Sequence, residues 1–182
     1  MRSFFQLRTA STNTKAYFSV DVEADGPNPA VGSMIEIGAV VVGKPNLKFQ
    51  SLLRPIHDRF SPKSLQISGI DREGLLQSGP DPEDVMKKFH SWILSSAAGS
   101  NPVFVSDNAF DWSFVDYYLH KYTGSNPFGH SPRNLHDLHK GFHRSLSSRL
   151  SDHRGPLTHG ALDDAQANAR YMERLIRDGL NH

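Results

Sequence analysis

Residues 17–26 read Tyr-Phe-Ser-Val-Asp-Val-Glu-Ala-Asp-Gly, and this stretch decides the fold expected for the chain. Apolar and polar side chains alternate from Phe18 onward, a period of two that predicts a β-strand with one face on a core. Asp21 and Glu23 leave the opposite face together. Such a pair can bind a hard cation, since Mg²⁺ and Mn²⁺ prefer oxygen ligands. The alternative is the polar, exposed face of an edge strand.

Two further strands are predicted directly after the first. Residues 24–29 contain Gly, Asn and two prolines, which is strong turn chemistry. Residues 34–42 are nearly continuously apolar and rich in β-branched side chains, and Gly43 and Pro45 are expected to end that strand. Residues 47–53 can form a third strand. Because the connections are short, we expect an antiparallel meander of three strands.

The rest of the chain alternates helices with short strands. The predicted elements are a loop region over 54–80 with a short helix at 62–67, a helix opened by Asp81 as N-cap, a strand at 102–106, a helix at 110–122, a fifth strand at 134–138 and a last helix at 162–177. This order predicts an α/β fold in which a mixed five-stranded sheet is flanked by helices.

Composition bounds the class of protein. The 182 residues suit one domain with a proper core, and no apolar run approaches the ~20 residues of a membrane span, so no membrane partner is expected. The absence of cysteine excludes disulfides, Cys-ligated zinc and thiol nucleophiles. The net charge is only +1, but residues 126–160 hold five Lys/Arg against two Asp. That segment suits a phosphodiester substrate or is a solvated basic loop.

The N-terminal residues 1–15 differ in composition from the rest of the chain. They contain three basic residues, several Ser/Thr and no acid, a composition compatible with an organelle transit peptide. Because an amphipathic repeat is lacking, we expect a simple N-terminal extension before a single domain over 16–182. The expected location is cytoplasmic, with organelle targeting as the alternative.

Three later residues carry candidate chemistry. Asp111 lies at a predicted helix start and Asp164 early in the last helix, where an acid is also explained by the helix dipole alone. His159 lies in the loop before that helix and is the proton acceptor that a metal-assisted hydrolysis needs. Asp163 points about 100° away from Asp164 around the helix. The nearby His136, His139 and His143 are predicted to be solvated.

Three segments resemble the motifs of the DEDDh exonucleases, the DnaQ-like branch of the RNase H-like superfamily. They are residues 17–26, the stretch Ser-Asp-Asn-Ala-Phe-Asp-Trp-Ser-Phe at 106–114, and His-Gly-Ala-Leu-Asp-Asp-Ala at 159–165. Each is weak alone, but together they follow the family's order. The resemblance implies an RNase H-like fold and two divalent cations, Mg²⁺ or Mn²⁺. It makes His159 the general base and the metal ligands Asp21, Glu23, Asp111 and Asp164.

The resemblance also implies where substrate would bind, with two departures. Ala24 stands where many members have Thr, so a contact to the terminal nucleotide is expected from the backbone of residues 24–26, which are Ala24, Asp25 and Gly26. Ser106 replaces a His found in several relatives. Phe110 and Trp112 flank Asp111 and can stack a base, with core packing as the alternative for one of them.

The preferred hypothesis is a 3′–5′ exonuclease that releases nucleoside 5′-monophosphates from single-stranded 3′ ends. A small stand-alone domain favours an exoribonuclease, similar to RNase T and the oligoribonucleases. The alternatives are an exodeoxyribonuclease of the proofreading or repair type, an RNase H-like endonuclease, and a catalytically silent nucleic-acid-binding module. The resemblance also implies a possible homodimer.

Overall fold

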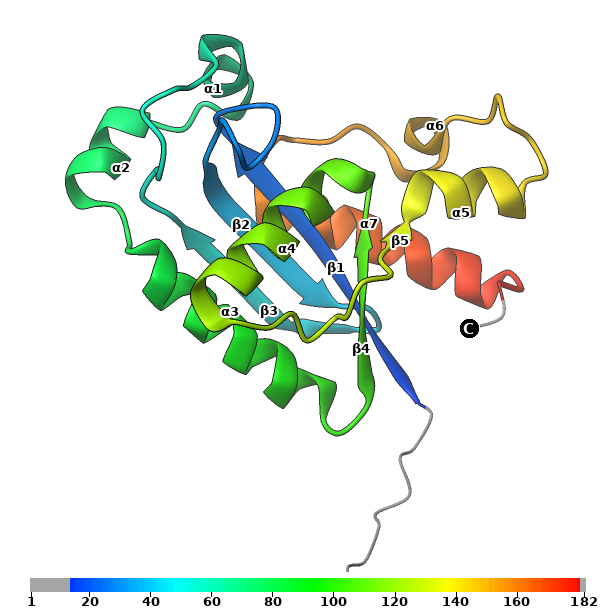
Figure 1. Ribbon diagram of the computed structural model, residues 1–182. Helices are drawn as coiled ribbons and strands as arrows, with labels where there is room; N and C mark the ends of the chain where they lie inside the picture. Colours follow the sequence, from blue (N-terminus) through cyan, green and yellow to red (C-terminus); the bar gives the residue numbers. More distant parts are fainter. Residues whose placement is uncertain (1–13, 181–182) are drawn as a thin grey trace, which may run out of the picture.

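The computed structural model describes residues 14–180, and residues 1–13 of the predicted extension lie outside them. A five-stranded mixed sheet forms the centre, with strand order β3-β2-β1-β4-β5. Strands β1, β2 and β3 are antiparallel, while β4 runs parallel to β1 and β5 parallel to β4. Helices α3 and α4 cover one face of the sheet and α7 the other (Figure 1). The strands are Lys15–Ala24 (β1), Met34–Val41 (β2), Lys44–Leu52 (β3), Asn101–Ser106 (β4) and Arg133–Asn134 (β5).

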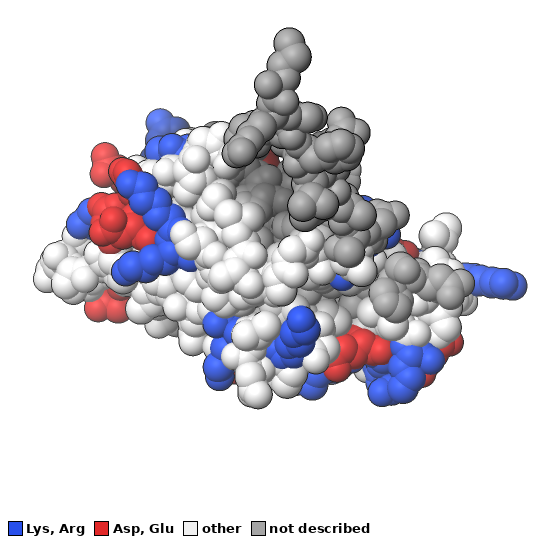
Figure 2. All heavy atoms as spheres, turned by 90° about the horizontal axis from the view of Figure 1, so that it is seen from below, with Lys and Arg blue, Asp and Glu red and all other residues white. Residues whose placement is uncertain are grey.

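Three of the helices, α3, α4 and α7, are long, and the others are short. They are Pro62–Ser68 (α1), Arg72–Ser78 (α2), Pro82–Ala97 (α3), Ala109–Thr123 (α4), Leu135–Phe142 (α5), Leu150–Arg154 (α6) and Ala161–Arg177 (α7). No helix within residues 14–180 is long and apolar enough to cross a bilayer. On the face shown in Figure 2, basic and acidic side chains are interspersed, in keeping with the small net charge.

The predicted meander is confirmed, with one correction at its second turn. Pro45 does not lie in the turn that ends β2. It is the second residue of β3, which begins at Lys44. A proline is tolerated there because β3 is an edge strand, whose outer N–H groups need no ladder partner. The pairing shifts register at Val40 and Val41 beside it.

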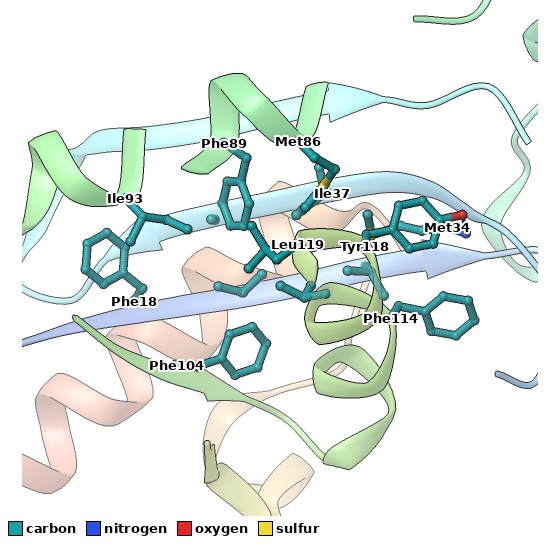
Figure 3. Packing of buried hydrophobic residues seen from close by; sticks show 14 of the residues in the cluster. Phe18, Met34, Ile37, Met86, Phe89, Ile93, Phe104, Phe114, Tyr118 and Leu119 are labelled. Carbon is teal, nitrogen blue, oxygen red and sulfur yellow. Dashed lines mark hydrogen bonds between the residues drawn. The ribbon is translucent and has the colours of Figure 1, made fainter. Parts of the chain in front are cut away.

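Strand β1 is buried on both faces, which the alternation alone did not predict. Its apolar residues join α3 and α4 in the main core, which Figure 3 shows around Phe18, Phe89 and Phe104. On the opposite face Ser19 is fully buried and Asp21 is only 6% exposed. Helix α7 covers that face, so the alternative of an exposed edge strand is wrong.

Helix α3 follows its sequence signals closely. Asp81 is its N-cap and accepts a hydrogen bond from the Glu83 N–H at 2.9 Å, as the position before Pro82 predicts. The apolar stripe of this helix packs against α4, and Met34 N–H donates to the Tyr118 hydroxyl of α4 at 2.9 Å. These contacts tie the first helical layer to β2.

Two regions differ from the prediction. The loop region before α3 contains a second helix, α2, capped by Asp71. The predicted fifth strand over 134–138 is only two residues long, because the Asn134 side chain accepts from Asp137 N–H at 3.2 Å and starts α5 instead. His139 of that helix was expected to be solvated, but it is fully buried.

Helix α7 lies unusually close to β2, at Gly38. This glycine is opposite Asp21 in the antiparallel register, on the face that α7 covers. A Cβ atom at position 38 would collide with the backbone of Ala161 and Leu162, the first residues of α7. The missing side chain therefore lets the start of α7 approach the sheet beside Asp21.

We predict that Gly38→Ala destabilises the fold and disturbs the start of α7. The new methyl group meets backbone atoms that cannot rotate away, so a loss of about 1–3 kcal/mol or more is expected in urea unfolding. Gly141→Ala is the matched control, because a Cβ at this helical glycine meets nothing within 4 Å. Equal stability of the two variants would contradict the close approach.

Candidate active site

The carboxyl end of β1 brings Asp21, Glu23 and Asp111 together. Strand β4 pairs with β1 only as far as Ser19, so the N–H of Val22 on that side is left without a ladder partner. The Asp111 side chain takes the place of the missing strand partner, since its Oδ1 accepts a hydrogen bond from the Val22 N–H at 3.2 Å. Since β4 runs parallel to β1, the first turn of α4 emerges at the same sheet end and places Asp111 there.

Asp164 organises the loop before α7. Its Oδ1 accepts from the N–H and the hydroxyl of Thr158, at 2.8 and 3.0 Å, and its Oδ2 accepts from the N–H of His159 at 2.9 Å. His159 has a positive φ of 61°, a conformation that is uncommon for a residue other than glycine. The loop thus holds His159 against the helix while its side chain stays exposed.

Glu23, His159 and Asp164 meet across the gap between β1 and α7. One donor atom from each lies within 4.8 Å of the others. Besides burial, the charge of Asp111 raises the pKa of Glu23, and the charges of Asp111, Glu23 and Asp164 raise the pKa of Asp21, so both aspartates lie close to this group. The structure therefore brings together all five residues that the sequence singled out.

The carboxylates resist ionisation in the absence of a cation. Burial, followed by Asp164, Glu36 and Asp111, raises the pKa of Glu23 to about 8. Burial also raises the pKa of Asp111 to about 7, against the opposing hydrogen bond from Val22 N–H. The pKa of Asp21 is raised well above its ordinary value by burial and by the charges of Asp111 and Glu23.

The donor set fits divalent cations. Asp111 Oδ2 is buried and has no hydrogen-bond partner. A buried, unpartnered carboxylate oxygen beside three further acids is costly unless a positive charge joins them. Oxygen donors of this kind are the preferred ligands of Mg²⁺ and Mn²⁺.

Two supporting groups were missed by the sequence reasoning. Glu36 faces Glu23 across the β1/β2 register, and its Oε2 accepts from Ala161 N at 3.2 Å, at the positive end of α7. Asp107 is buried and accepts from Arg154 Nη1 at 2.8 Å. The signal for Glu36 was available, since it is a lone acid within the apolar run of β2.

The predicted substrate contacts fall into two groups. Phe110 is 37% exposed and available for stacking, whereas Trp112 is half-buried with its ring edge-on to Phe104, as the core alternative described. Ala24 and Gly26 are buried, and a Cβ on Gly26 would lie 2.7 Å from the Cα of Gly32. Gly26 therefore serves the packing of its own turn.

Asp25 does not present its carboxylate to a substrate. The side chain is fully buried, accepts from Ser33 N–H at 2.5 Å and forms an ion pair of 2.8 Å with the buried Arg72. The carboxylate is therefore committed to the turn, and the backbone contact expected from residues 24–26 stays a prediction. The role of the Asp25 carboxylate is to hold the turn after β1 to α2.

We predict that Asp25→Ala costs about 3–5 kcal/mol of unfolding free energy, because it leaves Arg72 buried without its charge partner. Glu83→Ala is the control, since it breaks the exposed pair with Lys87 and should cost about 1 kcal/mol or less. Urea unfolding measures both. Equal losses of unfolding free energy in the two variants would show that the buried ion pair contributes no more to stability than the exposed one.

We predict that the protein, kept free of metal by EDTA, becomes less stable as the pH rises. The raised carboxyl pKa values mean that the folded state binds more protons than the unfolded state, so stability falls through the window from about 4.5 to about 8 set by Glu23. Asp21→Asn should raise the melting temperature in EDTA at pH 8 by removing one repelling charge. Asp163→Asn, on the exposed neighbour, should leave it unchanged; a lower melting temperature for Asp21→Asn would contradict the repulsion.

Comparison with known proteins identifies the family of the chain. The exonuclease family model named for RNase T matches residues 18–172. The 3′-5′ DNA exonuclease Cap18 of Escherichia coli is 38% identical over 173 residues, covering 91% of this chain and 92% of that protein.

Solved structures share the fold. The nuclease domain of 3′hExo, a DEDDh family member bound to rAMP, superposes with a TM-score of 0.73 at 21% identity, covering 93% of this chain and 96% of that one. Exonuclease I of E. coli, in complex with a dA16 oligonucleotide, gives a TM-score of 0.67 at 18% identity and is covered over 41% of its length. The chain belongs to the exonuclease family and is a 3′–5′ exonuclease of the DEDDh type, with the RNase H-like fold.

Proposed function

We propose that this exonuclease removes nucleotides one at a time from single-stranded 3′ ends, using two divalent cations held by Asp21, Glu23, Asp111 and Asp164. The observation that carries the proposal is the convergence of these four acids, whose burial and mutual repulsion raise three of their pKa values. Among residues 14–180, no basic side chain forms an ion pair with them, and Arg154 is paired with Asp107 instead.

The bound cations would balance the four carboxylates and stabilise the negative charge that develops on the oxygens around the phosphorus. Asp111 Oδ2 is available for this purpose because it has no hydrogen-bond partner. Asp164 has both oxygens in hydrogen bonds to the loop at residues 158–159. Asp164 therefore combines two tasks, since a carboxylate oxygen has a second lone pair for a cation.

His159 is the proposed general base. Its ring is exposed and one ring nitrogen lies within 4.8 Å of carboxylate oxygens of Glu23 and Asp164. In the proposed reaction an imidazole nitrogen of His159 takes a proton from the attacking water. The water oxygen then bonds to the terminal phosphorus, and the bond from phosphorus to the 3′ oxygen of the preceding nucleotide breaks. The product is a nucleoside 5′-monophosphate.

Single-stranded DNA is the substrate we favour. The sequence alone favoured RNA on the ground of domain size, but the relative with 38% identity along nearly its whole length is a DNA exonuclease. The solved structures do not decide the matter, since one holds rAMP and another a DNA oligonucleotide, at 21% and 18% identity. Exposed Phe110 offers a stacking surface for either kind of base.

The test is degradation of 5′-labelled DNA and RNA oligomers of equal sequence with Mg²⁺, Mn²⁺ or EDTA. We expect a ladder of single-nucleotide steps that requires a divalent cation and proceeds faster on DNA. Asp21→Asn should abolish the ladder and Asp163→Asn should not. Cleavage that persists in EDTA, or internal cuts alone, would overturn the proposal, while faster cleavage of RNA would restore the substrate first expected.

For the base, we predict that His159→Ala lowers kcat by about 10²–10⁴-fold, the usual contribution of general acid–base catalysis. Binding of Mn²⁺, followed by calorimetry, should change little, because the backbone N–H of residue 159 still bonds to Asp164. His120→Ala, an exposed histidine on α4, is the control. Unchanged turnover in His159→Ala would remove this residue from the role of base.

A further inference from the structure

A second group of potential metal ligands lies outside the active site, among α5, α6 and α7. His139 and His143 are four residues apart, at the end of α5, so they share one face of that helix. His153 reaches them from α6. One ring nitrogen from each of the three lies within 4.8 Å of the others. None of these residues belongs to the catalytic group described above.

We propose that His139, His143 and His153 form a binding site for a nitrogen-seeking divalent ion of the Zn²⁺, Co²⁺ or Ni²⁺ class. The three imidazole rings have centroids 4.6, 4.9 and 4.6 Å apart. Rings that bind one tetrahedral ion at ~2.0–2.1 Å per nitrogen have centroids about 5 Å apart. The rings are therefore already spaced as ligands of a single ion.

The surroundings orient the rings in the way that a histidine site requires. His139 Nε2 is 2.7 Å from the Ser148 hydroxyl, which leaves Nδ1 on the opposite side of the ring. A hydrogen bond from the second ring nitrogen to an oxygen is the usual support of a metal-bound histidine. His139 Nδ1 and His143 Nε2 both face the Tyr171 hydroxyl, at 2.5 and 3.3 Å. These two nitrogens thus converge on the Tyr171 hydroxyl, and an ion bound between them would have to displace that hydroxyl from both hydrogen bonds.

The groups around the three rings also bear on which cation the site would take. Burial and the neighbouring imidazoles lower the pKa of His139. Two guanidinium groups lie nearby, and both are bonded to oxygens: Arg154 to Asp107 and Asn168, and Arg174 to the carbonyl of His153. With imidazole nitrogens rather than carboxylates as donors, the site should reject Mg²⁺.

The proposed ion would join α5 and α6, two of the helices that follow β5. Helix α6 is only five residues long and has no side-chain N-cap hydrogen bond. A metal bond at His153 would fix this helix to α5, where the protein otherwise relies on few buried apolar groups, such as Leu150. The site is independent of the proposed nuclease chemistry, because it shares no residue with it.

The test is a Co²⁺ titration of metal-stripped protein, followed by visible absorption, with Zn²⁺ as competitor. The carboxylate site also binds such ions, so the titration is repeated in an Asp21→Asn, Glu23→Gln double variant. We expect one tight equivalent with the intense band of tetrahedral, nitrogen-rich Co²⁺ in both proteins. Addition of Mg²⁺ in large excess should not displace it, and Zn²⁺ should.

His143→Ala and His153→Ala should each weaken this binding by at least about 100-fold and abolish the rise in melting temperature that Zn²⁺ produces. Both side chains are exposed, so the variants should fold, which circular dichroism checks. His120→Ala is the control at an exposed histidine on another helix. Loss of the Co²⁺ band in the double carboxylate variant, or its survival in His143→Ala, would overturn the site and leave a hydrogen-bonded imidazole cluster.

Discussion

The close approach of α7 to the sheet at Gly38 is the constraint on which the rest of the active site depends. Asp164 lies in the first turn of α7, and Asp21 lies opposite Gly38 in the β1/β2 register. Any side chain at position 38 would push the helix start outward. Because a helix of this length is rigid, such a shift would carry Asp164 and the loop that holds His159 away from β1.

The same close approach brings several carboxylates together, and hydrogen bonds from backbone N–H groups offset part of their mutual repulsion. Glu36 accepts from the first N–H of α7, and Asp164 accepts two backbone N–H groups of its preceding loop. Asp111 likewise accepts the unpaired N–H of Val22. These bonds fix the carboxylates in place, yet they do not neutralise them, as the raised pKa values of Asp111 and Glu23 show. The site therefore concentrates carboxyl groups whose negative charge is balanced by protons at low pH and would be balanced by a bound cation at higher pH.

Local signals predicted only part of the fold and part of the site. The alternation in β1 and the Asp81 cap gave elements close to their observed bounds, and strand parity indicated Asp21 and Glu23. The other three site residues needed the resemblance to known motifs. Strand β5 was predicted too long, because a side-chain cap competes there with strand pairing. The buried ion pair of Asp25 was not predicted, since its partner Arg72 lies 47 residues away in a helix that the sequence did not reveal.

Helix α6 connects the two groups of potential ligands through consecutive residues. Arg154 bonds to Asp107, which lies beside the catalytic acids, and His153 turns toward His139 and His143. The two groups differ in donor chemistry, since one offers carboxylate oxygens and the other imidazole nitrogens. Hard cations prefer the first and nitrogen-seeking ions the second. The difference in ligand type would therefore keep a catalytic ion and a structural ion in separate sites of one domain. This holds even though the adjacent residues His153 and Arg154 of α6 face the histidine group and the neighbourhood of the carboxylates, respectively.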